Sequence, residues 1–343
     1  MKAAVWHGPG DMRVETIKEP VPGPDDLLLE VICCNICGSD VRTYSSGSSS
    51  IRPGTILGHE FAGRALKAPR WTGLSEGDLV TAAQDTPCGE CWYCRNGLEH
   101  ICENKMEFGK HFPGAFAEMM VVPEIVLRKG WVKRIPAGMS VEEASLIEPA
   151  SSCVHAQSTS PVRRGDSVLI IGAGPIGCIH AELAKSAGAG KVILADVSED
   201  RLELAGRFQV DVRVNPAGED WRAVVLNHCP QGVDLAISAC PSPKALVDAV
   251  GLVRKAGRVV SFGGLPKDDH HVSLDGNRIH YDEVTVTGSY AYSRHENDRA
   301  LSLIERKVIH AAMYVTSSVS LDEIIEGMDQ ARHARALKVQ VRP

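Results

Sequence analysis

The stretch Val168-Leu169-Ile170-Ile171-Gly172-Ala173-Gly174-Pro175-Ile176-Gly177 decides the fold of the second half of the chain. Its first four residues form a short, fully apolar run, which is typical of a parallel strand buried on both faces. A glycine-rich turn follows. Residues 175–187 then have the length of a helix, with proline tolerated in its first turn. The sequence therefore predicts a strand, a tight turn and a helix in direct succession.

The glycines of this stretch have the spacing G-x-G-x-x-G of a dinucleotide-binding turn. Gly172 permits the tight turn, Gly174 lets the backbone approach a pyrophosphate, and Gly177 lets the helix pack closely on the strand. The N-terminus of the helix, whose first turn contains Pro175 and Ile176, offers unpaired N–H groups to phosphate oxygens. We therefore expect these five residues to bind a dinucleotide.

Asp196 stands at the end of the next apolar run, where an acidic residue is expected after such a turn. Its carboxylate can accept hydrogen bonds from the adenosine ribose and would repel a 2′-phosphate, which favours NAD over NADP. We also expect Arg201 to contact the cofactor. The alternative is that the glycines only build a βαβ turn and that Asp196 is a solvated loop acid. That alternative leaves the register of strand, helix and acid unexplained.

Apolar runs and helical segments alternate on both sides of this turn. Further strands are predicted at 192–195, 234–237 and 257–262, with helices at 201–207 and 242–255. Such alternation predicts an α/β domain with a doubly wound parallel sheet. Near the C-terminus, a helix is expected at 296–307 and an apolar strand at 339–341.

The first 150 residues differ from the rest in composition and in the pattern of their apolar residues. They are rich in glycine and proline, and their apolar runs, such as 1–6, 27–32 and 119–122, are too short for helices. Turn signals separate these runs, so this part is predicted to be a β-rich domain.

Length and composition exclude several classes of protein. The chain has 343 residues, which is enough for two domains, and 44% hydrophobic with 23% charged residues is ordinary for a globular protein. The net charge is −6 and the sequence contains no block of basic residues, which argues against a nucleic-acid-binding surface. No window approaches the roughly 18 apolar residues of a membrane helix, and the first ten residues lack the apolar core of an export signal. A cytoplasmic protein is expected.

Four of the eleven cysteines are closely spaced. Cys88, Cys91, Cys94 and Cys102 form C-x2-C-x2-C-x7-C, which in a reducing compartment matches a closed tetrahedral zinc site with no open position for chemistry. Such a site has a structural role. An iron–sulfur cluster is the alternative, although a lone cluster would have no obvious electron partner here.

A second set of metal-ligand residues is dispersed along the chain. It consists of Cys37, the pair His59 and Glu60, and Glu148. One thiolate, one imidazole and carboxylates suit a catalytic zinc that keeps a position open for water or substrate. Each residue alone also has an ordinary structural explanation, so spacing by itself leaves this site open.

Together these motifs resemble the zinc-dependent medium-chain alcohol dehydrogenases, and within them the polyol (sorbitol-type) branch. The resemblance covers essentially the whole chain, with the motifs in the family's order. Its carriers are Cys37-Gly38-Ser39-Asp40, Gly58-His59-Glu60, the four cysteines, Glu148-Pro149, Gly172–Gly177 and Asp196.

The resemblance implies an arrangement of domains. Residues 1–151 and 290–343 are expected to form a β-rich, GroES-like catalytic domain that binds zinc. Residues 152–289 are expected to form an inserted Rossmann domain. Similar enzymes are homodimers or homotetramers.

The resemblance also assigns roles at the metal. Cys37 and His59 become direct ligands of a catalytic zinc, and Glu60 and Glu148 exchange places as ligand or water partner. The glutamate at 148, where the simple-alcohol branch carries a cysteine, favours a polyol or sugar-like substrate. Lys338 resembles the family's basic residue near the pyrophosphate, with an exposed surface lysine as the alternative.

The expected reaction is hydride transfer from a secondary alcohol to NAD, and its proton needs an exit. Ser39, two residues after Cys37, is placed to relay it. Many relatives carry a histidine three residues later, whereas this chain has Arg42, which does not shuttle protons at physiological pH. Arg42 either pairs with an anionic substrate group, pairs with a cofactor phosphate, or is a solvated surface arginine.

Two other functions are compatible with parts of the sequence. A zinc-free enone or quinone reductase of the same superfamily would not need Cys37, His59 and Glu148 together. A zinc-stabilised NAD-binding protein without turnover is the second alternative. The sequence leaves the substrate open among polyols, cyclitols, sugars and their phosphates.

Overall fold

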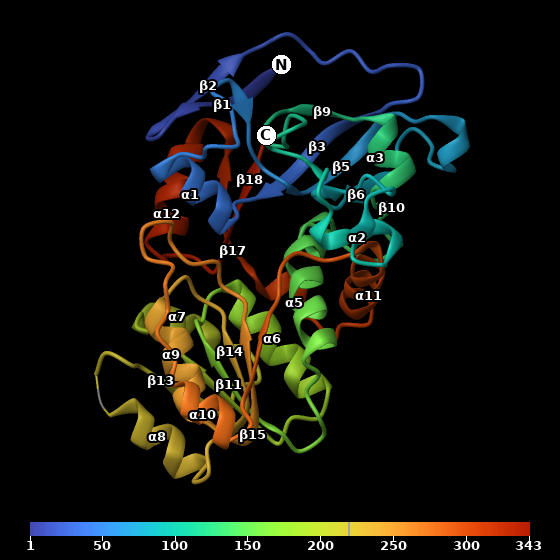
Figure 1. Cartoon of the computed structure of the whole chain (residues 1–343). Helices are drawn as coiled ribbons and strands as arrows, with labels where there is room; N and C mark the ends of the chain where they lie inside the picture. The colour runs from blue at the N-terminus through green and yellow to red at the C-terminus, as the bar shows by residue number, and fades with distance from the viewer. Residues whose placement is uncertain (219) are drawn as a thin grey trace. The chain divides into compact units, whose positions relative to one another are not determined.

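A computed structural model describes residues 1–218 and 220–343 (Figure 1). The chain divides into two compact units, of which the first joins Met1–Ser151 to Tyr292–Pro343 and the second is Ser152–Ala291. The first unit is therefore built from both ends of the chain, with the second inserted between them.

The second unit contains a six-stranded sheet in the order β13-β12-β11-β14-β15-β16, with every neighbouring pair parallel. Numbered by their order in the chain, the strands follow the sequence 3-2-1-4-5-6, which is typical of a doubly wound fold. The order of the strands reverses between the first and the fourth, which lie side by side and parallel. The predicted parallel α/β fold is confirmed. Its strands are β11 (Ser167–Ile171), β12 (Lys191–Ala195), β13 (Val212–Val214), β14 (Val233–Ser238), β15 (Val253–Ser261) and β16 (Thr285–Gly288). Its helices are α6 (Pro175–Ser186), α7 (Glu199–Ala205), α8 (Trp221–His228), α9 (Pro243–Leu252) and α10 (Gly276–Tyr281).

Two predicted helix boundaries in this unit were wrong. The helix expected at 242–255 ends at Leu252, because Val253 is buried and already pairs with Val233 of β14 as the first residue of β15. The helix expected at 201–207 begins at Glu199, because the Ser198 hydroxyl accepts the N–H of Arg201 and caps the first turn. Strand pairing therefore sets the end of α9, and side-chain capping sets the start of α7, at positions that differ from the predicted ones.

The first unit is centred on a seven-stranded sheet. Its main path is β10-β6-β5-β3-β18-β17, and β9 pairs with β3 beside it. A smaller sheet has the order β2-β1-β4. The strands of the large sheet are β3 (Leu27–Asn35), β5 (Glu60–Lys67), β6 (Leu79–Ala82), β9 (Met119–Val122), β10 (Val132–Arg134), β17 (Val315–Ser320) and β18 (Lys338–Arg342). The small sheet contains β1 (Lys2–Gly8), β2 (Asp11–Thr16) and β4 (Thr55–Ile56).

Short helices accompany these sheets, and none of those before residue 160 was predicted. They are α1 (Gly38–Ser46), α2 (Trp92–Arg95), α3 (Glu124–Lys129), α4 (Val141–Ala144), α5 (Ile147–Thr159), α11 (Arg294–Glu305) and α12 (Ile324–Arg332). Helix α5 begins in the first unit and continues into the second.

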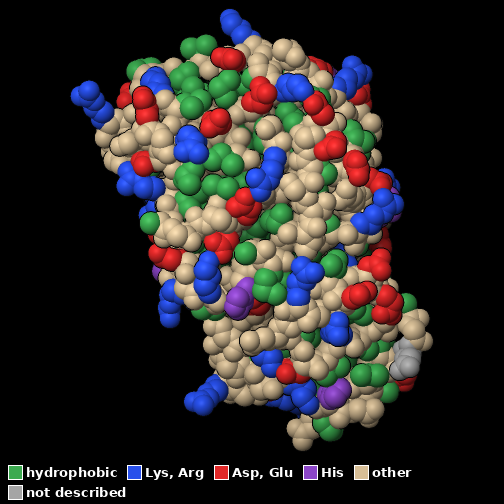
Figure 2. Space-filling view, turned by 180° about the vertical axis from the view of Figure 1, so that it is seen from behind, with side chains coloured by type: hydrophobic (Ala, Val, Ile, Leu, Met, Phe, Trp, Pro, Cys, Tyr) green, Lys and Arg blue, Asp and Glu red, His purple; other side chains and the backbone are tan. Residues whose placement is uncertain are grey.

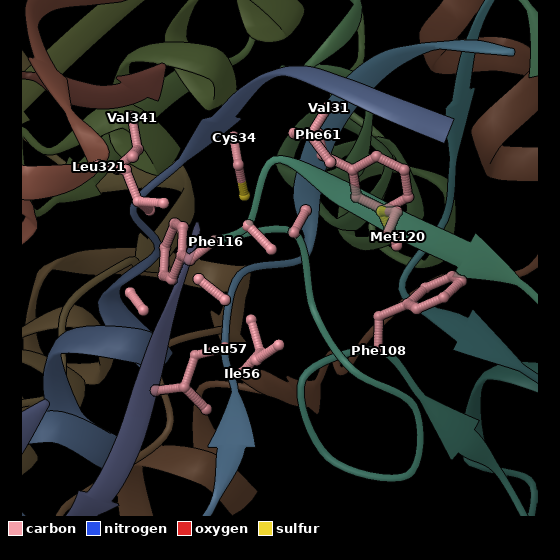
Figure 3. Packing of buried hydrophobic residues seen from close by; sticks show 14 of the residues in the cluster. Val31, Cys34, Ile56, Leu57, Phe61, Phe108, Phe116, Met120, Leu321 and Val341 are labelled. Atoms are coloured by element: carbon pink, nitrogen blue, oxygen red, sulfur yellow. The ribbon is translucent and has the colours of Figure 1, made fainter. Parts of the chain in front are cut away.

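The core of the first unit includes buried side chains of its central strands and of the loops beside them (Figure 3). Phe61 and Phe108 meet edge to face with their ring centroids 5.6 Å apart. Cys34 and Phe116 border Gly58, where an added Cβ would lie 2.9 Å from the Cys34 sulfur and from the Phe116 ring. The residues next to His59 and Cys37 therefore sit on a closely packed foundation.

Among the described residues, none of the helices combines the length and apolarity that crossing a membrane requires. On the face shown in Figure 2, acidic and basic side chains are interspersed.

The glycine turn gives a stability prediction with a matched control. A Cβ on Gly177 would lie 1.8 Å from the carbonyl oxygen of Gly172, whereas a Cβ on Gly174 meets nothing within 4 Å. We expect Gly177→Ala to lower the free energy of unfolding by about 3 kcal/mol, because the helix must move off the strand. Gly174→Ala should change it by less than about 1 kcal/mol. Equal midpoints in denaturant unfolding of the two variants would contradict the predicted close packing.

Candidate functional site

Three of the four dispersed ligand candidates lie together in the first unit. Cys37 precedes α1 directly after β3, and His59 and Glu60 stand where β5 begins. Because β3 and β5 are antiparallel, with Asn35 opposite Glu60, the end of one strand meets the start of the other. The sulfur of Cys37, a ring nitrogen of His59 and a carboxylate oxygen of Glu60 all lie within 4.8 Å of one another. A thiolate, an imidazole and a carboxylate at this separation are a donor set that fits zinc.

Asp40 holds two of these ligand loops together. Its Oδ2 accepts the backbone N–H of Cys37 at 2.9 Å. Its Oδ1 accepts the N–H of Gly58 at 3.4 Å and lies 3.6 Å from Nδ1 of His59. A carboxylate beside Nδ1 orients the imidazole and leaves Nε2 for a metal ion. Sequence reasoning missed this role, although the spacing Cys37-x-x-Asp40 is that of a capping box.

The charges of this cluster shift one another's ionisation. Burial lowers the pKa of His59, but Asp40 and Cys37 raise it well above its usual value. Burial also raises the pKa of Asp40, an effect that His59 opposes. The negative charge of Asp40 thus stabilises the positively charged form of the buried His59 imidazole, and the same negative charge would favour a bound cation.

Lys338 forms a buried ion pair with Glu60. Its Nζ lies 2.6 Å from each of the two carboxylate oxygens, and the side chains are 6% and 0% exposed. Lys338 begins β18, which pairs with β3 through Gln340 and Asn35. Burial lowers the pKa of Lys338, but Glu60 and Cys37 raise it above the ordinary value, so the lysine stays charged. The alternative of an exposed surface lysine is wrong, and the expected pyrophosphate contact stays a prediction.

Glu148 lies beside this cluster but outside the group of three. It is the second residue of α5, and its Oε1 accepts a 2.8 Å hydrogen bond from the hydroxyl of Tyr292. Burial raises the pKa of Glu148 to about 7, with His59 opposing the rise and Glu60 adding to it. Tyr292 was not singled out as a site residue, because nothing local in the sequence links it to a glutamate 144 positions away.

The four cysteines of the second motif also lie together. All four sulfur atoms fall within 4.8 Å of one another, with Cys88 and Cys94 4.0 Å apart and Cys91 and Cys102 3.9 Å apart. A tetrahedral zinc with Zn–S bonds of about 2.3 Å places its sulfur atoms about 3.8 Å apart, so the group fits this ion. Backbone N–H groups of Cys94 and Glu103 lower the pKa of Cys91 to about 6, which favours the thiolate.

The four-cysteine segment is an excursion between two short paired strands. These are β7 (Asp85–Thr86) and β8 (Met106–Glu107), joined by the pairing of Asp85 with Glu107. The ammonium of Lys105 lies 2.8 Å from Asp85 and 3.7 Å from Glu107, and all three side chains are nearly buried. The strand pairing and these ion pairs hold the two ends of the four-cysteine segment together.

The dinucleotide turn of the second unit has the expected geometry. Gly172 adopts φ 119°, a left-handed conformation that glycine permits, and α6 begins at Pro175 with Gly174 as its N-cap. No side chain caps this helix, so its first N–H groups face the turn. Because an added Cβ at Gly174 would meet nothing within 4 Å, protein packing leaves room there for a phosphate.

Asp196 is buried against this turn. Its Oδ2 accepts the N–H of Ala173 at 2.7 Å, and its Oδ1 accepts the N–H of Ser198 at 2.9 Å. The guanidinium of Arg201 lies 3.7 Å from Oδ2. The structure thus brings Asp196 and Arg201 together beside the glycines, while their contact with a cofactor stays a prediction.

Two remaining candidates lie on α1. Ser39 is half-buried two residues after Cys37, and Arg42 is exposed one turn further along the helix. Their proposed roles in proton release and anion binding stay predictions.

Comparison with known proteins gives a consistent set of similarities. Residues 23–137 match the family described as alcohol dehydrogenase GroES-like domain, and residues 175–306 match the zinc-binding dehydrogenase family. The first of these matches confirms the expected GroES-like fold of the β-rich part. The chain is 32% identical to an L-threonine 3-dehydrogenase of Saccharopolyspora erythraea over 99% of this chain and 98% of that one.

Solved structures with this fold span the whole chain. A zinc-binding dehydrogenase of Sinorhizobium meliloti, bound to NADP, superimposes with a TM-score of 0.92 at 29% identity and covers 100% of this chain and 99% of its own. A 2R,3R-butanediol dehydrogenase of Bacillus subtilis gives a TM-score of 0.89 at 28% identity, with coverage of 100% and 99%.

The two ligand groups predict the metal content. We expect two zinc ions per chain, with the one at Cys37 removed first by a chelator, because its ligands leave a position open. Cys37→Ser should leave one zinc with little change in melting temperature. Cys94→Ser should lose the other and lower the melting temperature by several degrees.

Elemental analysis together with thermal unfolding measures both effects. Cys240→Ser, at a cysteine outside both groups, is the control and should retain two zinc ions. A single zinc in the unaltered protein, or loss of the same ion in both metal-ligand variants, would contradict the assignment of two sites.

Proposed function

Because the chain belongs to the zinc-dependent medium-chain dehydrogenases, we propose that it oxidises a secondary alcohol with NAD as the hydride acceptor. The observation that carries this proposal is the group of Cys37, His59 and Glu60, in which His59 and Glu60 are buried, with Glu148 beside it. A zinc-free enone or quinone reductase has no use for this donor set. A non-catalytic NAD-binding protein has no use for the partly exposed Glu148 beside it.

We propose that Cys37 and His59 hold the zinc, with Glu60 and Glu148 as alternating ligand or water partners. Zinc bound there would supply the Lewis acidity that lowers the pKa of a substrate hydroxyl, and a nicotinamide would supply the hydride acceptor. Asp40 keeps the His59 ring oriented, and Lys338 balances the charge of Glu60. Ser39 accepts the hydroxyl proton and passes it to water.

The substrate class is proposed from what the similar proteins have in common. Threonine carries its secondary hydroxyl next to an amino group, and 2,3-butanediol carries it next to a second hydroxyl. We therefore propose a secondary alcohol with a heteroatom on the adjacent carbon. Polyols and sugar-like substrates are included in this class, as are hydroxy amino acids. A vicinal heteroatom offers a second, weaker donor to the open side of a metal centre.

A substrate screen tests the function. NADH formation should appear with some members of a panel of vicinal diols, polyols, cyclitols, their phosphates and hydroxy amino acids. His59→Gln should lower kcat/KM at least about 1,000-fold while leaving the fold intact, because the metal loses a ligand. Two bound zinc ions without NADH formation across the whole panel would favour the protein without turnover.

Asp196 tests the cofactor preference. Asp196→Asn keeps an acceptor for the Ala173 N–H but removes the negative charge that would repel a 2′-phosphate. We expect the ratio of kcat/KM for NADP over NAD to rise about 10-fold or more, equivalent to about 1.4 kcal/mol.

The control for this variant is Asp200→Asn, an exposed acid in α7. It should leave the ratio unchanged. If both variants gave the same NADP-to-NAD ratio as the unaltered protein, Asp196 would not be the residue that discriminates between the two cofactors at the adenosine ribose.

A further inference from the structure

Glu148 is held by a residue from the distant return segment of the chain. The hydroxyl of Tyr292 donates to Glu148 Oε1 at 2.8 Å, and Tyr292 is only 4% exposed. A hydrogen bond from a neutral phenol to the ionised form of a carboxyl group is charge-assisted and stronger than a bond between neutral groups. It commits one of the two carboxylate oxygens and fixes the direction of the other.

Tyr292 is itself fixed from the side of the four-cysteine segment. The backbone N–H of Gln84, next to β7, donates to the Tyr292 oxygen at 3.3 Å. Two residues after the tyrosine, the guanidinium of Arg294 forms a bidentate ion pair with Glu99 inside the four-cysteine segment, at 2.6 and 3.1 Å. The phenol therefore accepts from one neighbour and donates to another, so its hydroxyl has a single defined direction.

The backbone before Tyr292 is strained. Ala291 adopts φ 53°, in the left-handed region that costs a residue with a Cβ roughly 1 kcal/mol. Such a conformation persists where surrounding contacts over-determine it, and it often accompanies a functional constraint. Ala291 directly precedes Tyr292, whose hydroxyl donates to Glu148.

We propose that Tyr292 is a positioning residue that orients the carboxylate of Glu148 toward the metal bound by Cys37 and His59. This inference rests on the metal centre of the proposed function and names a residue that sets its geometry. Without the phenol, Glu148 rotates freely and its affinity for the metal, or for the metal's water, changes. Tyr292 acts through Glu148 and is assigned no contact with substrate.

Cobalt substitution tests this role without substrate or cofactor. Co²⁺ replaces zinc and its visible absorption reports the ligand geometry. The signal of the candidate centre is the component that Cys37→Ser removes. Tyr292→Phe should shift this component and speed metal loss to a chelator about 10-fold, the range expected when an outer partner of a ligand is removed. Tyr314→Phe, at a fully buried tyrosine of the same unit, is the control and should leave both unchanged.

A double-variant cycle separates positioning from a general packing effect. In a Glu148→Gln background, Tyr292→Phe should cause no further shift of the cobalt component, because the residue that it orients is already altered. Additive shifts would overturn the proposal, and so would identical spectra of Tyr292→Phe and the unaltered protein. If no cobalt component depended on Cys37, the metal centre of the proposed function would fall as well, which distinguishes the two failures.

Discussion

The pairing of β3 with β5 and β18 is the constraint on which the candidate site depends. Asn35 of β3 lies opposite Glu60 on one side and Gln340 on the other. Three strands far apart in sequence thus come into register at one point, which brings together Cys37, Glu60 and Lys338. A slip of one residue in either pairing would turn the side chains of that strand to the opposite face and separate the ligands.

Because these charged side chains are buried, each one needs an oppositely charged partner, and the partners fix its orientation. Asp40, His59, Glu60 and Lys338 are all nearly excluded from water, and each faces an opposite charge. Removing one partner of a buried ion pair costs about 3–5 kcal/mol, because the other charge is left uncompensated. Such a network is a weak source of net stability, but it fixes the direction of the side chains that would hold a metal. Orientation is what a metal centre needs from its surroundings.

The sequence predicted what is encoded within short stretches. The glycine turn, the strand before it and the four cysteines each lie within about fifteen residues, so their spacing alone carries the geometry. Contacts between distant segments left no such signal. Lys338 meets Glu60 across 278 positions, and only the path of β18 beside β3 brings them together. Asp40 was within reach, since it follows the pattern of a helix cap, but its spacing was not interpreted in that way. The end of α9 could not be predicted because Val253 pairs with Val233 of β14, a contact that the local sequence does not indicate.

The two metal-ligand groups differ in what holds them before a metal ion arrives. Cys37, His59 and Glu60 stand at the ends of paired strands on a packed core, and hydrogen bonds and ion pairs already orient them. The four cysteines lie on short helices and loops, where Trp92 and Ile101 are substantially exposed. A segment with so little apolar burial cannot repay the entropy of ordering its own backbone. We expect metal binding at the four cysteines to be part of folding, whereas the side chains around Cys37 and His59 are already oriented by the fold. Because Glu99 belongs to the four-cysteine segment and pairs with Arg294, order in that segment also reaches Tyr292 and Glu148.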